Sequence, residues 1–241
     1  MAASCFVSVD NVMRVTVLTV SIRASVRGMV TPDGAVPATP PAELPADRPM
    51  SWPVVSSRYL HRDDWVVALR EDVITRPEHP EHPEQFSRIS LEHPGAVIVM
   101  AVDEHDRVVC LRQYRHTSGH EFVELPAGLR DAADEPPVET AKRELREEVE
   151  LEAAEWRLLL STWSSAGISD EVHDIFLARG LSHAPRGNFE MRHEEAEMEV
   201  FWTPVADLLE AVLQGRVRQG PLAQAVLAYE VLRQRGTLEA H

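Results

Sequence analysis

The chain has 241 residues, of which 44% are hydrophobic and 26% charged, and its formal net charge at pH 7 is −15. This length suits one main domain with a proper core, and the negative charge disfavours nonspecific binding to nucleic acid or to an anionic membrane. A bound anion would therefore need a local group of arginines or metal ions. The two cysteines, Cys5 and Cys110, lack metal-ligand spacing, and a reduced cytoplasmic setting is expected.

The first part of the chain, residues 1–51, is expected to be a disordered extension and linker outside the fold. Residues 31–53 are rich in Pro and Ala and lack periodicity, which is typical of a flexible linker. One hypothesis is that Met50 is the true start and that residues 1–49 are an over-called extension. No apolar run reaches the roughly 18 residues of a membrane helix, and residues 1–30 lack the basic start and compact apolar stretch of an export signal.

Residues 52–94 are predicted to form a small N-terminal antiparallel β region. WVVAL (65–69) and DVITR (72–76) are apolar or alternating runs of the kind found in strands. The polar, Pro-rich segment 77–85 follows, and its histidines are better explained by a solvent-exposed loop than by a metal site. The next stretch, residues 95–115, is predicted to form two strands around a D-E-H-D turn.

The rest of the chain alternates between predicted strands and helices. The expected strands are 121–128, 156–165, 171–181 and 197–202, and the expected helices are 136–149, 203–215 and 221–236. Strands on both sides of a central helix, with further helices at the end, predict an α+β domain with a mixed sheet over residues 95–236.

The central helix is amphipathic. Counted at about 100° per residue, four apolar side chains form one stripe for the core: Val138, Ala141, Leu145 and Val149. Two i,i+4 pairs are expected on the opposite side, Glu139 with Arg143 and Arg146 with Glu150. That side is adequately explained as a solvated, salt-bridged surface.

Three glutamates of the same helix are less easily explained. Glu144 and Glu148 lie directly beside the apolar stripe, with Glu147 on their outer flank. Carboxylates that border a buried seam lose solvent and repel one another unless a cation compensates their charge. Mg²⁺ prefers oxygen ligands and suits such a patch. From periodicity alone, a Glu-rich solvated surface remains an equal alternative.

The segment before the helix favours the metal hypothesis. ELPAG leaves a strand, breaks at Pro126 and exposes backbone at Ala127 and Gly128, where a carbonyl oxygen is available to complete a metal shell. For this loop alone, a plain strand-to-helix connection is the simpler interpretation.

Loop and helix together resemble the Nudix box. The family pattern is Gly, five residues, Glu, seven residues, then Arg-Glu-apolar-x-Glu-Glu-x-Gly-apolar. In this chain the pattern begins at Gly128, reaches Glu135, and after seven residues ends in RELREEVEL (143–151). There are two departures: six residues separate Gly128 from Glu135, and Glu150 stands where the family has Gly. We expect both to affect geometry or stability more than the reaction class.

Beyond the box, the chain is similar to the ADP-ribose pyrophosphatase branch, especially its bacterial members. The similar stretches are LRQYRHTSGHEFVELPAG (111–128), GISDE (167–171), HEEAEME (193–199) and the closing helices, within about residues 52–232. One departure is Ala166, where that branch usually has Pro. The resemblance implies a Nudix-like α/β/α sandwich, a homodimer formed through the N-terminal strands, and a small-molecule nucleotide substrate.

The resemblance also implies catalytic and metal-binding roles. Mg²⁺, or Mn²⁺, would be bound by Glu144, Glu147, Glu148 and the carbonyl of Ala127, and Arg143 would hold the glutamates in place. The general base would be Glu171, on a mobile loop, with Glu147 as the fallback. A turn or helix cap is the alternative explanation of Ser169-Asp170-Glu171.

Further residues are candidates for substrate binding. They are Arg112 and Arg115 for phosphate, Glu124 for ribose or for an arginine, and Ser169 of the mobile loop. Glu194 and Glu195 are candidates for extra carboxylates near the metal, and a solvated turn is the alternative. Tyr114 and Trp163 are expected to fill the core rather than to stack on a base.

The predicted reaction is the hydrolysis of ADP-ribose to AMP and ribose 5-phosphate. Two alternatives stay open: hydrolysis of another linked diphosphate, such as NADH, a nucleotide sugar or a dinucleoside polyphosphate, and a non-catalytic Nudix domain that only binds nucleotide. The intact glutamates argue against the non-catalytic domain, whereas Ala166 and Glu150 keep it open. No nucleic-acid-binding module is visible in the sequence.

Overall fold

The computed structural model describes residues 44–62, 67–77, 84–132 and 134–238. The predicted extension therefore lies largely outside the described residues, as do most of the Pro-rich segment 77–85 and part of WVVAL. A compact unit begins at Ser51 and contains all the described strands and helices. In the described part of the chain, no helix is long and apolar enough to span a membrane.

An N-terminal antiparallel sheet has the order β1-β2-β3. Its strands are β1 (Val54–Arg62), β2 (Ala68–Thr75) and β3 (Gln85–Glu92). Ion pairs cross the strands, with Arg58 Nε 2.6 Å from Glu71 Oε2 and Arg62 Nη2 2.6 Å from Glu92 Oε2. The sequence did not predict β3 as a separate strand, whereas a small N-terminal antiparallel sheet was expected and is present.

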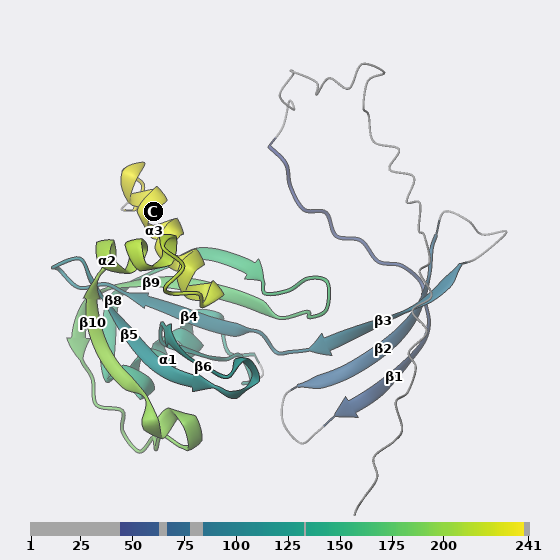
Figure 1. Cartoon of the computed structure of the whole chain (residues 1–241), viewed down its shortest axis with the longest axis horizontal. Coiled ribbons are helices and arrows are strands. Elements are labelled where there is room, and N and C mark those ends of the chain that lie inside the picture. Colours follow the sequence, from purple (N-terminus) through teal and green to yellow (C-terminus); the bar gives the residue numbers. More distant parts are fainter. Residues whose placement is uncertain (1–43, 63–66, 78–83, 133, 239–241) are drawn as a thin grey trace, which may run out of the picture. The chain divides into compact units, whose positions relative to one another are not determined.

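Two further sheets form the centre of the fold (Figure 1). Their strands are β4 (Ala96–Ala101), β5 (Arg107–Arg115), β6 (His120–Glu124), β7 (Ala127–Leu129), β8 (Leu151–Trp163), β9 (Val172–His183) and β10 (Glu199–Pro204). One sheet has the order β7-β4-β9-β8 and the other β10-β5-β6. Only β4 and β9 run parallel among the described pairs, so the four-stranded sheet is mixed, as predicted. Strand β8 begins five residues before the expected start at residue 156.

Helices cover both faces of the four-stranded sheet. Helix α1 (Pro137–Val149) lies on one face, and α2 (Val205–Leu213) and α3 (Gly220–Gln234) lie on the other (Figure 1). The alternation along β4 creates both contacts, because successive side chains of a strand point to opposite faces.

Two apolar clusters result from this alternation. Val97, Val99 and Ala101 of β4 share a buried cluster with Ala141 and Leu145 of α1. Ile98 and Met100 share the other cluster with Leu222 and Val226 of α3. The α/β/α arrangement and the α+β class are confirmed.

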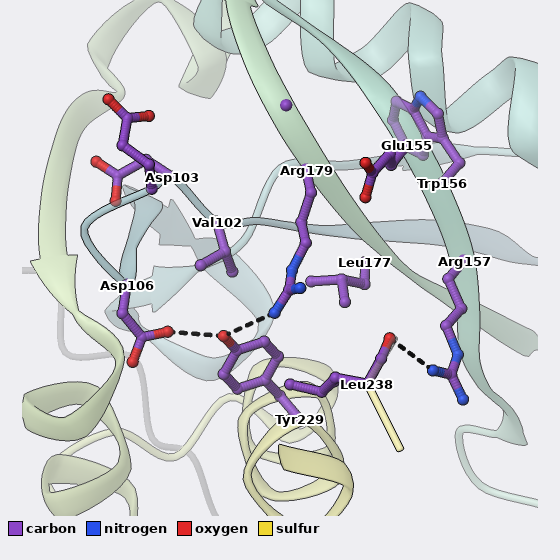
Figure 2. Close-up of a pocket in the computed structure, with 12 residues that line it drawn as sticks. Val102, Asp103, Asp106, Glu155, Trp156, Arg157, Leu177, Arg179, Tyr229 and Leu238 are labelled. Carbon is purple, nitrogen blue, oxygen red and sulfur yellow. Dashed lines mark hydrogen bonds between the residues drawn. The ribbon is translucent and has the colours of Figure 1, made fainter. Parts of the chain in front are cut away.

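The C-terminal helix is fastened to the sheet by polar contacts. The Tyr229 hydroxyl donates to Asp106 Oδ1 over 2.6 Å and accepts from Arg179 Nη2 over 3.3 Å (Figure 2). Arg157 Nη1 donates to the carbonyls of Thr237 and Leu238 over 2.5 and 2.8 Å. These contacts border an open cavity of about 1100 Å³, which is lined by α3, the β4–β5 turn and strands β8 and β9.

Candidate active site

Gly128 brings strand β7 very close to helix α1. A Cβ added at Gly128 would lie 2.0 Å from Cδ and 2.1 Å from Oε1 of Glu144. Such distances are impossible for real atoms, so only glycine leaves room for the Glu144 carboxylate here. The glycine that opens the Nudix-like pattern thus has a direct steric role in placing a predicted metal ligand.

Glu144 and Glu148 are buried side by side on α1, with 9% and 6% of their surfaces exposed. Burial, opposed by Arg143 and reinforced by Glu147, raises the pKa of Glu144 to about 7. Burial and the neighbouring Glu144 raise the pKa of Glu148 well above its usual range, although its Oε2 accepts a 2.9 Å hydrogen bond from the Ala127 N–H. The folded chain therefore disfavours negative charge at both carboxyls unless a cation is added.

Arg143 is in direct contact with this carboxylate group. Its Nη1 lies 2.7 Å from Glu144 Oε1 and 3.0 Å from Glu147 Oε2, and its Nη2 lies 3.8 Å from Glu135 Oε2. The Glu135 carboxylate also accepts a 2.8 Å hydrogen bond from the Thr140 hydroxyl. Arg143 thus connects three of the pattern's glutamates.

The two ion pairs predicted for the outer side of α1 are wrong. Glu139 pairs with Lys142, with a distance of 2.8 Å, and Arg143 turns to the other carboxylates. Arg146 Nε donates to the carbonyl of Pro185, and Glu150 faces Arg186 instead, with 3.6 Å between the charged atoms. Nearby charged residues replace the first pair and groups distant in sequence replace the second, because an exposed i,i+4 pair contributes only about 0.3–0.5 kcal/mol.

The predicted phosphate-binding arginines lie on β5. Arg115 makes a two-pronged contact with the buried Glu124, from Nε to Oε1 over 2.9 Å and from Nη2 to Oε2 over 2.7 Å. The positive charge of Arg115 also acts on Glu148. Arg112 lies 3.3 Å from Glu199 Oε2, and its guanidinium stacks over Phe201. Of the two arginines, the one that shares the electrostatic environment of the α1 carboxylates is Arg115.

The short 3₁₀ helix His193–Glu197 adds a negative charge to the site. Glu195 acts on both Glu144 and Glu148 and raises the pKa of each. The carboxyl groups of Glu144, Glu148 and Glu195, which come from two elements, therefore repel one another when they are charged.

The 164–171 loop holds the predicted base, Glu171, in a polar setting. Its Oε1 lies 3.1 Å from His173 Nε2 and 3.5 Å from His93 Nδ1. The hydrogen bond from His173, against the effect of partial burial, lowers the pKa of Glu171 to about 2. Ser169, a predicted substrate ligand, donates from Oγ to the Leu91 carbonyl over 3.3 Å and accepts from the Glu171 N–H over 3.1 Å.

The expectation that Tyr114 and Trp163 fill the core is wrong. Their exposed fractions are 46% and 57%, respectively. Tyr114 makes a 3.1 Å hydrogen bond with His116, and Trp163 lines a surface hollow of about 470 Å³ together with Ile168.

The cavity of about 1100 Å³ lies among residues that do not belong to the carboxylate group (Figure 2). Three of its polar groups are bonded to one another, since Tyr229 joins Asp106 and Arg179. Its position indicates no part in the chemistry of α1.

Comparison with known proteins identifies the family. A model of the NUDIX domain matches residues 91–225. The chain is 41% identical over 174 residues to an ADP-ribose pyrophosphatase of Mycobacterium tuberculosis, which covers 72% of this chain and 81% of that protein. The chain belongs to the Nudix family. This Nudix chain is also 32% identical over 136 residues to an ADP-ribose pyrophosphatase of Bacillus subtilis, which covers 56% of this chain and 72% of that protein.

A solved structure of an ADP compounds hydrolase has the same fold. The superposition gives a TM-score of 0.62 at 16% identity and covers 80% of this chain and 100% of that chain. The predicted Nudix membership and the predicted class of enzyme, a pyrophosphohydrolase, are confirmed by these similarities. Nudix hydrolases generally use divalent metal ions, and their presence is expected for this enzyme.

The carboxylate group fits a divalent ion in charge and in donor type. Glu144 and Glu148 supply hard oxygen donors whose negative charge is insufficiently compensated, and Gly128 keeps space around Glu144. Among the residues described, no three acidic, histidine or cysteine side chains are already arranged around one point as ligands. Binding therefore requires a rearrangement of these side chains that brings their oxygens around one point.

Proposed function

We propose that this Nudix enzyme hydrolyses ADP-ribose to AMP and ribose 5-phosphate with Mg²⁺, or Mn²⁺, as the cofactor. The observation that carries the proposal is the pair of buried carboxylates, Glu144 and Glu148, behind Gly128. Similarity to two ADP-ribose pyrophosphatases supports the choice of substrate.

In this proposal, Glu144, Glu147, Glu148 and the Ala127 carbonyl hold the metal. Bound divalent ions neutralise the diphosphate and orient it for attack. Arg143 keeps the carboxylates together through its contacts with Glu144 and Glu147.

Other residues bind the substrate and move the proton. Arg115, oriented by its two hydrogen bonds to Glu124, contacts a phosphate, with Arg112 as the second arginine and Ser169 as a loop contact. Glu171 accepts the proton of the attacking water when the loop closes. The water oxygen bonds to one phosphorus, and the bond from that phosphorus to the bridging oxygen breaks.

The proposal includes a cytoplasmic homodimer. Every residue of β1 is exposed, and Val54, Val55, Tyr59 and Leu60 present apolar side chains with 41–54% of their surfaces accessible. An exposed edge strand of this kind is suited to pairing with a second chain. Light scattering coupled to gel filtration tests this, and a monomer at micromolar concentration contradicts it.

Product analysis tests the reaction. Purified protein with Mg²⁺ is offered ADP-ribose, NADH and a panel of nucleotide sugars, and AMP with ribose 5-phosphate from ADP-ribose is the expected result. Preference for another compound selects the alternative linked diphosphate, and binding without turnover of any compound selects the non-catalytic domain.

Two substitutions test the assigned residues. Glu148→Gln should lower the rate by orders of magnitude while the protein stays folded. Glu171→Gln should slow turnover without abolishing metal binding, and an unchanged rate moves the role of base to another residue, first Glu147.

A further inference from the structure

We propose that His173 is a positioning residue that holds the Glu171 carboxylate away from the α1 glutamates until the 164–171 loop closes. The inference rests on the proposed function, in which Glu171 is the general base. His173 itself contacts neither substrate nor metal and acts through Glu171.

The two faces of the central sheet separate Glu171 from the predicted metal ligands. His173 lies two residues before Ile175 on β9, and Ile175 belongs to the apolar cluster beneath α3. Residues two apart on a strand share a face, so His173 points to the α3 side. Glu144 and Glu148 come from α1, on the opposite side. Because the Glu171 carboxylate is bonded to His173, it is held on the side away from them.

The imidazole of His173 is buried, and its hydrogen bond to Glu171 is the one polar contact that the described residues give it. Only 8% of the residue is exposed, and its Nδ1 is fully buried with no hydrogen-bond partner. Nε2 lies 3.1 Å from Glu171 Oε1 and donates to it, while Nδ1 makes no hydrogen bond. A buried polar ring satisfied on one side only depends on its one partner. The depressed pKa of Glu171, caused first by this hydrogen bond, shows that the contact favours the charged carboxylate.

The loop that carries Glu171 is also held by hydrogen bonds to residues 91–93. The Leu91 N–H donates to the Ile168 carbonyl over 2.7 Å, and the Leu91 carbonyl accepts from the Asp170 N–H over 3.3 Å. The His93 N–H donates to Asp170 Oδ1 over 2.8 Å. His93 Nδ1 accepts from the Gly95 N–H, so in this arrangement it carries no proton to donate to Glu171. The Glu171 carboxylate is therefore bonded to His173 outside the loop and to Ser164 within it, while residues 91–93 bond the rest of the loop.

Release of Glu171 has a cost that sets how often the loop is closed. If the closed loop is only a fraction of the population, the apparent affinity for substrate is reduced by that fraction. Removing the hydrogen bond to a charged carboxylate should raise the closed fraction, by roughly tenfold for a typical contact of this kind. Substitution of His173 should therefore lower KM for ADP-ribose, the reverse of what a damaged site produces.

The test uses the full-length protein and two variants of His173. His173→Leu removes the donor and keeps an apolar ring-sized volume, whereas His173→Gln keeps an N–H donor. His183→Leu, at the exposed end of the same strand, is the matched control. Amide hydrogen exchange of residues 164–171 and steady-state kinetics with ADP-ribose are measured on each.

We expect faster exchange in the loop and a several-fold lower KM for His173→Leu, with both values returning towards wild type in His173→Gln. Unchanged loop exchange overturns the inference, as does a fall in kcat at constant KM that the glutamine variant restores. If His173→Leu fails to fold, Asp170→Ala, which removes the contact with the His93 N–H, should give the same faster loop exchange. A wild-type enzyme that turns over no substrate contradicts the proposed function, while hydrogen exchange still tests the hold on Glu171.

Discussion

Replacement of Glu150 by glycine should stabilise the folded enzyme. Glu150 follows the last turn of α1 with φ 56° and ψ 40°, the left-handed conformation that costs a non-glycine residue about 1–2 kcal/mol. Nudix proteins have glycine at the corresponding position of the box, and this chain keeps the backbone shape without the residue that suits it. The Glu150 N–H still donates to the Arg146 carbonyl over 3.1 Å, and its own carbonyl accepts from the Ala184 N–H over 2.8 Å.

The size of the gain follows from three contributions. Glycine relieves the left-handed strain of about 1–2 kcal/mol. The greater conformational freedom of glycine in the unfolded chain offsets roughly 0.5–1 kcal/mol of this gain in stability. The pair of Glu150 with Arg186, at 3.6 Å and with 42% of the Glu150 side chain exposed, contributes little, about 0–0.5 kcal/mol. The net expectation for Glu150→Gly is stabilisation by about 0.5 kcal/mol, or about 1–2 °C in Tm.

Urea unfolding of the wild type, Glu150→Gly and Glu150→Ala measures this difference in stability. Glu150→Ala is the matched control, because it also loses the ion pair and yet keeps a Cβ in the left-handed conformation. Glycine should exceed alanine by about 0.5–1 kcal/mol in the free energy of unfolding. If the alanine variant is as stable as the glycine variant, the strain attributed to Glu150 is absent and the reasoning is refuted.

Three further predictions concern other contacts. Gly128→Ala should displace Glu144 and lower metal-dependent turnover at least tenfold, whereas Gly220→Ala, which meets no atom within 4 Å, should not. Tyr229→Phe should lower stability by about 1 kcal/mol in urea unfolding, through loss of the bond to Asp106, and leave turnover unchanged. Burial raises the pKa of Cys110 to about 12, so in a Cys5→Ser background this thiol should resist iodoacetamide at pH 8 until the protein unfolds; the stability that the neutral thiol contributes is lost only as pH rises from 9 towards 12.

The sequence predicted the central helix and its glutamates well because the signal is local. The apolar period of the helix places Ala141 and Leu145 in the core, and that placement carries Glu144 and Glu148 to the edge of the buried seam. Strand β3 was missed, since Phe86, Ile89 and Leu91 do not alternate strictly with polar residues. A strand is recognised from sequence mainly by that alternation.

Contacts between segments distant in the chain could not be predicted from the sequence. Arg146 reaches the Pro185 carbonyl rather than Glu150, because β9 returns beside the end of α1. Glu171 contacts His93, which lies 78 residues earlier in the chain. No local sequence pattern encodes this contact. The alternation of β9 does predict that His173 and Ile175 share one face. It does not reveal that His173 bonds to Glu171.

The opposite pKa shifts of the acidic residues suggest how the proposed chemistry divides among them. Burial makes the α1 carboxyls reluctant to carry charge without a cation, and Glu144 has a pKa of about 7. Glu171 is shifted the other way, to about 2, and in that state it is a weak proton acceptor. Departure from His173 removes the main cause of the depression, so its pKa must rise towards the ordinary value of a glutamate. The movement that would bring Glu171 to the substrate would therefore also make it a stronger base, and a loop that stayed open would leave the enzyme with an inactive carboxylate rather than an exposed base.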